Sequence, residues 1–164
     1  MIRIALLASI SLVIFSAASH ENARGQSMDV PLIAQTSAEH AGLTRAWFVQ
    51  APLDATRSKL THIDFQSGLI LLVTDEAQLH VLDPETGLRQ WSFQVGDKRF
   101  VAQSAAANDN YVAVANNIHL FLLDRASGNL VFSPLLTGTP ATGPVLTDNH
   151  VITPLVQGQL EAYP

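Results

Sequence analysis

Short apolar runs alternate with polar, turn-forming residues along the chain from about residue 60 to its last residue. The runs are rich in Val, Ile, Leu, Phe and Tyr, and clusters of Gly, Asn, Asp and Ser separate them. Runs of this length and composition are typical of β-strands. We expect strands at Leu60–Phe65, Leu69–Thr74, Leu79–Leu82, Gln90–Val95, Val101–Ala106, Tyr111–Ala115, His119–Leu123, Val131–Leu136, Val145–Thr147, His150–Thr153 and Gln159–Tyr163. The pattern predicts an all-β protein.

The apolar runs belong to an internal repeat. QLHVLD (78–83), HLFLLD (119–124) and QLEAYP (159–164) align without gaps, and their last residues lie 41 and 40 positions apart. A period near forty made of short strands is typical of β-propeller blades of four antiparallel strands. We expect blades at 58–96 and 97–138 and an incomplete one at 139–164, about two and a half blades in all.

The stretch DPETGLRQW (83–91) connects two of these strands and is matched by DRASGNLVF (124–132). Asp83 suits the first position of a type I turn, where its carboxylate accepts backbone N–H bonds. Gly87 suits a position with positive φ, and Trp91 can bury its ring between neighbouring sheets. Turn chemistry explains every residue, so the motif is interpreted as structural rather than catalytic. Asp124, Gly128 and Phe132 are its second copy.

The spacing of Val81, Asp83, Thr86, Gly87 and Trp91 resembles the tryptophan-docking repeat of pyrroloquinoline-quinone-like (PQQ-like) β-propellers. The resemblance covers residues 60–164, within the wider WD40/YVTN-like propeller superfamily. The run VPLIAQTSAEHAGLTRAWFVQAPL (30–53) is similar to exported propeller proteins of planctomycete type. The resemblance implies that the repeat is a scaffold element joining blade to blade. The family includes quinoprotein dehydrogenases, and also propellers without a quinone, such as an outer-membrane-assembly factor.

The first residues have the features of an export signal. Arg3 provides a positive charge, an apolar stretch follows, and Ser16-Ala17-Ala18 offers a cleavage site. The apolar stretch is too short for a bilayer span, which needs about 20 residues. We expect a signal peptide at 1–18, a linker at 19–44 and no stable membrane span after cleavage, which places the protein in the periplasm or cell envelope.

RAWFVQ (45–50) resembles RQWSFQ (89–94), the outer strand of the first blade. A lone outer strand before the first blade is what ring closure would need, by pairing with a last blade. A closed ring needs at least about four blades. Three explanations remain open: a truncated reading frame, which we favour, assembly with another copy or a separate second half, or an open array of blades.

Composition narrows the chemistry. The net charge of −5 disfavours a nucleic-acid partner, which requires a basic face. The absence of cysteine excludes disulfides, thiolate zinc sites and thiol nucleophiles. The six histidines have no close metal-binding spacing, and no phosphate-binding loop or serine-nucleophile motif occurs. We therefore predict no catalytic, cofactor-binding or metal-binding residues.

The expected function is a non-catalytic exported scaffold for protein or cell-envelope interaction, with a protein partner or a second propeller half. This choice follows the resemblance, since fold alone does not determine function. The first alternative is part of a PQQ-dependent quinoprotein oxidoreductase, the only case that calls for PQQ with calcium. The second is a truncated remnant without independent function.

Overall fold

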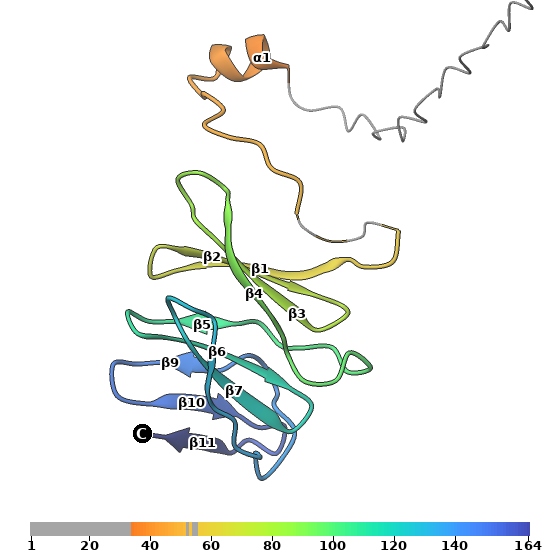
Figure 1. Ribbon diagram of the computed structural model, residues 1–164, viewed down its shortest axis with the longest axis vertical. Coiled ribbons are helices and arrows are strands. Elements are labelled where there is room, and N and C mark those ends of the chain that lie inside the picture. Colours follow the sequence, from red (N-terminus) through yellow and green to blue (C-terminus); the bar gives the residue numbers. More distant parts are fainter. Residues whose placement is uncertain (1–33, 52, 54–55) are drawn as a thin grey trace, which may run out of the picture.

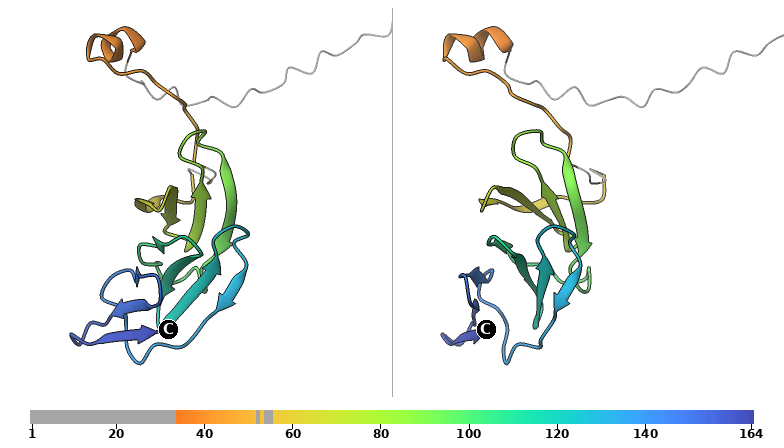
Figure 2. Two further views of the ribbon diagram at one scale, coloured as in Figure 1. Left: turned by 90° about the vertical axis from the view of Figure 1, so that its left-hand side faces the viewer. Right: turned by 60° about the vertical axis from the view of Figure 1, so that its left-hand side comes forward.

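The computed structural model describes residues 34–51, 53 and 56–164, so the predicted signal peptide at 1–18 lies outside the described residues. A short helix, α1 (Gln35–His40), precedes three antiparallel sheets that follow one another along the chain (Figure 1). The two further views show the sheets stacked side by side (Figure 2). The chain is therefore all-β and is built of propeller blades, as predicted.

Each sheet is one blade, and its strands pair in chain order. Blade 1 consists of β1 (Leu60–Gln66), β2 (Leu69–Thr74), β3 (Gln78–Leu82) and β4 (Arg89–Gln94). Blade 2 consists of β5 (Ala106–Ala107), β6 (Tyr111–Asn116), β7 (His119–Asp124) and β8 (Leu130–Phe132). Blade 3 consists of β9 (Val145–Leu146), β10 (Val151–Pro154) and β11 (Leu160–Tyr163).

The central strands β2 and β6 carry the core, because nearly all of their residues are buried. β2 and β6 are almost entirely apolar, and most of their residues are buried. A strand covered on both faces is expected to show a continuous apolar run instead of alternation. Leu71, Val73 and Val81 of blade 1 lie in one apolar cluster with Val112 and Leu123 of blade 2. A smaller cluster joins blades 2 and 3 through Ala113, Leu120, Leu136, Val151 and Leu155.

Two strands are much shorter than predicted. The strand expected at Val101–Ala106 is reduced to β5 (Ala106–Ala107), with one isolated bridge from Ala102 to Asn116. The strand expected at Val131–Leu136 ends at Phe132, and Leu135 makes only an isolated bridge with His119. Pro134 interrupts the outer strand, since proline has no N–H to donate to a ladder.

The segment Arg45–Gln50, predicted as a lone outer strand, belongs to no described strand. It leads from α1 to blade 1 along the outside of the stack (Figure 1). Within the described part of the chain, no helix is long and apolar enough to cross a membrane.

Candidate functional site

The Asp83 turn is built as the sequence predicted. One carboxylate oxygen of Asp83 accepts hydrogen bonds from the backbone N–H groups of Glu85 and Thr86 at 3.0 and 2.8 Å and from the Thr86 hydroxyl at 2.9 Å. The Gly87 N–H donates to the carbonyl of Asp83 at 2.8 Å. The bonds from Thr86 and Glu85 hold the pKa of Asp83 below its usual value, although burial opposes this effect. The carboxylate is thus engaged within its own turn.

The Asp124 turn repeats this geometry with serine in place of threonine. The Asp124 carboxylate accepts from the hydroxyl and the backbone N–H of Ser127, at 2.6 and 2.8 Å. The Gly128 N–H donates to the Asp124 carbonyl, also at 2.8 Å. Hydrogen bonds from Ser127 hold the pKa of Asp124 below its usual value. Gly87 and Gly128 both have positive φ, 71° and 72°, as the sequence led us to expect.

Trp91 joins blade 1 to the turn of blade 2. It lies on β4, opposite Val81, and is only 9% exposed. Its indole Nε1–H donates to the carbonyl of Arg125 at 2.8 Å. Its ring lies so close to Gly128 that a Cβ at that residue would be 2.6 Å from it. Glycine is therefore required at this position for two reasons. Its backbone has a positive φ, and the indole ring occupies the space that a side chain would need.

Trp47 makes the same contact one blade earlier. Its Nε1–H donates to the carbonyl of Pro84 at 2.8 Å, and a Cβ at Gly87 would lie 2.6 Å from its ring. Trp47 is not among the motif residues that the repeat predicted. Its role could have been predicted from the match of RAWFVQ (45–50) to RQWSFQ (89–94), because this match aligns Trp47 with Trp91. The segment Arg45–Gln50 thus occupies the docking position of an outer strand.

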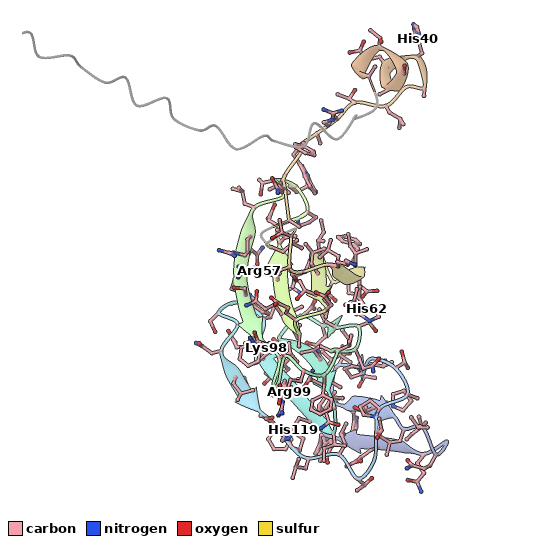
Figure 3. The ribbon with its side chains drawn as sticks, turned by 90° about the vertical axis from the view of Figure 1, so that its right-hand side faces the viewer. His40, Arg57, His62, Lys98, Arg99 and His119 are labelled. Carbon is pink, nitrogen blue, oxygen red and sulfur yellow. The ribbon has the colours of Figure 1, made fainter. Side chains whose placement is uncertain are left out.

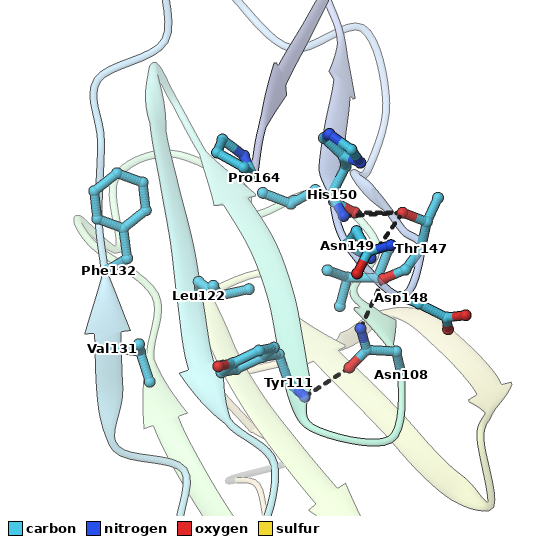
Figure 4. Close-up of a pocket in the computed structure, with 12 residues that line it drawn as sticks. Asn108, Tyr111, Leu122, Val131, Phe132, Thr147, Asp148, Asn149, His150 and Pro164 are labelled. Atoms are coloured by element: carbon cyan, nitrogen blue, oxygen red, sulfur yellow. Dashed lines mark hydrogen bonds between the residues drawn. The ribbon is translucent and has the colours of Figure 1, made fainter.

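Phe132, the counterpart of Trp91 in blade 2, is more loosely held. Its ring is 45% exposed and contacts Tyr163 edge-on, with ring centroids 5.8 Å apart. A cleft of about 460 Å³ lies beside it, bounded by Tyr111, Leu122, Pro164 and the turn from Thr147 to His150 (Figure 4). By the repeat alignment, Pro164 stands where Asp124 begins the turn that covers Trp91. The cleft therefore corresponds to the place of a docking turn.

His80 is a buried histidine that fills a packing position. It is 1% exposed, and neither ring nitrogen has a hydrogen-bond partner among the described residues. Burial, followed by the nearby charge of Arg89, lowers the pKa of His80, so the ring is neutral at pH 7. The repeat aligns it with Phe121, whose ring packs against Phe93 at 6.0 Å. We therefore assign His80 the same role as an aromatic filler.

Within the described ranges, no group of three or more His, Asp or Glu residues could hold a metal ion. Of the basic side chains labelled in Figure 3, His40 on α1 lies far from the others, whereas Lys98, Arg99 and His119 lie near one another. Arg99 and His119 line the same pocket. Arg99 is paired with Asp97, and this pair lowers the pKa of Asp97 to about 2.

Both ends of the blade stack expose apolar surface. On blade 1, Ile63 and Phe65 are 69% and 67% exposed, and they pair with Leu72 and Ile70 on the face that points away from blade 2. We call Ile63, Phe65 and Ile70 the front face. On blade 3, Leu160 and Val145 are 74% and 56% exposed and flank Ile152 on the side away from blade 2. We call Val145, Ile152 and Leu160 the back face.

Comparison with known proteins identifies the fold. No protein-family model matches the sequence, and no curated protein matches it. The computationally designed Ika4 protein matches with a TM-score of 0.54 and 15% identity, over 64% of this chain and 65% of that one. The β-propeller domain of Cps50 (Swd1) from Myceliophteria thermophila matches with a TM-score of 0.51 and 15% identity, over 63% of this chain and 37% of that domain. BamB from Moraxella catarrhalis matches with a TM-score of 0.42 and 18% identity, over 62% of this chain and 32% of that one. The chain thus spans less than two thirds of the length of each, and the match to the β-propeller domain of Cps50 (Swd1) shows that its sheets are arranged as propeller blades.

Proposed function

We propose that this chain is a non-catalytic β-propeller scaffold that binds protein through its blade ends, in the periplasm or cell envelope. The observation that carries this proposal is the pair of exposed apolar faces at the two ends of the stack. In a propeller, each blade buries its faces against its neighbours, so these two faces are complementary to further blade-like protein surface.

The motif residues support a scaffold role for a second reason. The carboxylates of Asp83 and Asp124 accept hydrogen bonds from residues of their own turns, and the indole N–H of Trp91 donates to the next blade. These are the residues that the resemblance to PQQ-like propellers singles out. Their contacts hold neighbouring blades together, which is the role expected of scaffold residues.

The experiment that tests the proposal is site-specific photo-crosslinking in the exporting cell. A photo-reactive phenylalanine analogue replaces Phe65 on the front face or, as a matched control, Glu85 in the exposed turn of the same blade. We expect crosslinks to a polypeptide from position 65 and few from position 85. Equal or absent crosslinking at both positions would contradict the proposal.

The quinoprotein alternative has its own test. The purified chain is incubated with PQQ and calcium, and dye reduction is followed with primary alcohols and sugars. Dye reduction that depends on both the quinone and calcium would show that the chain is an oxidoreductase, and the scaffold proposal would be wrong.

A further inference from the structure

The two rims of the junction between blades 1 and 2 differ in how their arginines are bonded. Because antiparallel strands reverse at each turn, the β1–β2, β5–β6 and β7–β8 turns lie at one rim, and the β4–β5 connection and the β6–β7 turn lie at the other. At the first rim, the guanidinium of Arg125 donates to the backbone carbonyls of Asn108 and Ser67 at 2.7 and 2.5 Å. At the second rim, the side chain of Arg99 is 80% exposed. The second rim therefore presents a guanidinium to solvent.

A pocket of about 530 Å³ opens at this second rim, beside the β6–β7 turn. The side chain of Asn116, only 2% exposed, fixes the β4–β5 connection against blade 2. Its amide nitrogen donates to the carbonyl of Phe100 at 2.6 Å, and its amide oxygen accepts from the backbone N–H of Asp97 at 3.3 Å. The pocket is thus held open by bonds within the fold. We call it the rim pocket, and the residues that matter for its chemistry are Asp97, Arg99, Phe100, Asn116, His119 and Phe121.

Arg99 and His119 bring hydrogen-bond donors to the rim pocket. The Nε of Arg99 donates to the Asp97 carboxylate at 2.8 Å, and its Nη2 bonds the same oxygen. No hydrogen bond within the described part of the chain involves Nη1 of Arg99, so a ligand can accept from this nitrogen. The ring of His119 stacks on Phe121, with centroids 6.0 Å apart and planes at 30°. Asp97 thus orients one donor, and Phe121 orients the other.

The charge around the rim pocket is positive, although the net charge of the chain is −5. Asp97 is the only acidic residue among the described residues that line the pocket, and Arg99 neutralises it. Lys98 lies near Arg99 and His119 and adds a further positive charge (Figure 3). Free N–H groups with an excess of positive charge favour an anionic ligand, above all a carboxylate or another oxyanion.

Apolar side chains surround the charged groups. Phe100, which lines the rim pocket, is 44% exposed, and its neighbour Val101 is 53% exposed. Ile118, in the turn beside His119, is 36% exposed. Arginine among aromatic and aliphatic side chains is typical of a protein-binding surface. A nucleic acid would instead require a broad basic face, which this acidic chain lacks among its described residues.

We propose that the rim pocket binds an acidic segment of a partner protein, in which a carboxylate lies beside an aromatic or aliphatic side chain. Nη1 of Arg99 and the ring of His119 donate to the carboxylate, while Phe100 contacts the apolar side chain. Asp97 is a positioning residue, because it acts through the guanidinium. The site goes beyond the proposed function, since it lies at a rim and uses neither the front face nor the back face.

The test uses the purified natural chain and two small probes that differ only in charge. The first probe is N-acetyl-glutamyl-phenylalanine amide, and the second is its neutral glutaminyl counterpart. Backbone amide NMR spectra of the isotope-labelled chain are recorded as each probe is added. We expect saturable shifts at Arg99, Phe100 and His119. The Kd of the charged probe should be about ten-fold lower than that of the neutral probe, as for one charge-assisted hydrogen bond.

Two variants assign the binding to the rim pocket. Arg99→Gln should raise the Kd of the charged probe about ten-fold, and it should fold because this side chain is largely in water. Arg89→Gln is the matched control, since it makes the same charge change on an exposed residue at the opposite end of β4. It should leave the Kd unchanged.

The inference would be overturned by the absence of saturable shifts, by equal Kd values for the two probes, or by equal weakening in the two variants. Shifts confined to Ile63 and Phe65 would also overturn it, because the probe would then bind the front face. The proposed function is tested separately by crosslinking at position 65. If position 65 gives no protein crosslink but the charged probe binds at Arg99, the rim pocket stands and the blade-end proposal is wrong.

Discussion

The two blade junctions of this protein use the same repeat positions but are packed to different degrees. At the first junction, Trp91 is 9% exposed and donates a hydrogen bond to the turn of the next blade. At the second, Phe132 is 45% exposed and lies beside a cleft of about 460 Å³. A phenyl ring has no N–H to donate, so it can dock through apolar contact only. The first junction is tight because the ring of Trp91 both donates the indole bond and lies under the turn of the next blade.

The largest expected effect comes from the aromatic residue at each junction. Trp91→Ala should lower the free energy of unfolding by about 3–5 kcal/mol, the usual range for removing a buried large aromatic side chain. Phe132→Ala should cost only about 1 kcal/mol, because nearly half of its surface is already in water. Urea denaturation of both variants at pH 7 measures the difference. Equal losses would mean that the second junction is as tight as the first.

Trp91→Phe distinguishes the contribution of the buried ring from that of the indole hydrogen bond. This variant keeps an aromatic ring at the first junction but cannot donate to the carbonyl of Arg125. We expect a loss between those of the two alanine variants. A stability equal to that of the natural chain would show that the indole bond contributes nothing.

The next effect concerns the glycine under the indole. Gly128→Ala should cost about 2–4 kcal/mol, of which about 1–2 kcal/mol is the left-handed backbone and the rest is displacement of Trp91. Gly158→Ala is the matched control, because its φ is +79° but nothing lies within 4 Å of an added Cβ. Gly158→Ala should lose only the part of the unfolding free energy that comes from the left-handed backbone, about 1–2 kcal/mol. Thermal unfolding monitored by circular dichroism compares the two. Similar losses would show that the contact with Trp91 is not tight.

The smallest effect is the acid dependence of the Asp124 turn. Because the pKa of Asp124 is lower in the folded chain than its ordinary value of 3.8, its hydrogen bonds stabilise the folded state above that pH. Their contribution is lost as pH falls through the lower, folded-state pKa. The urea midpoints of Asp124→Ala and the natural chain should therefore differ at pH 7 and approach one another as the pH falls below 3.8. Ser127→Ala, which removes the donor hydroxyl, should show a weaker form of the same convergence. A difference that stays constant with pH would contradict this account.

Local sequence determined the elements that depend on neighbours in the chain. The apolar runs of β2 and β6 were predicted to within a residue, since a fully covered strand must be apolar throughout. The Asp83 and Asp124 turns were also predicted, because a carboxylate that bonds the N–H groups two and three residues later needs no distant partner. The repeat period then predicted the blade, since one hairpin sequence recurs at a fixed distance.

Tertiary structure decided which parts of the chain meet. Hydrophobic pattern could not show that β5 would shrink to two residues, because the residues before it make other contacts: Ala102 forms only an isolated bridge with Asn116, and the Asn116 side-chain amide donates to the carbonyl of Phe100. Nor could it show that Trp47 and Trp91 each lie on a glycine of the following blade, with about forty residues between ring and glycine. An indole can donate to any accessible carbonyl, and only the stacking of one sheet on the next selects the carbonyls of Pro84 and Arg125.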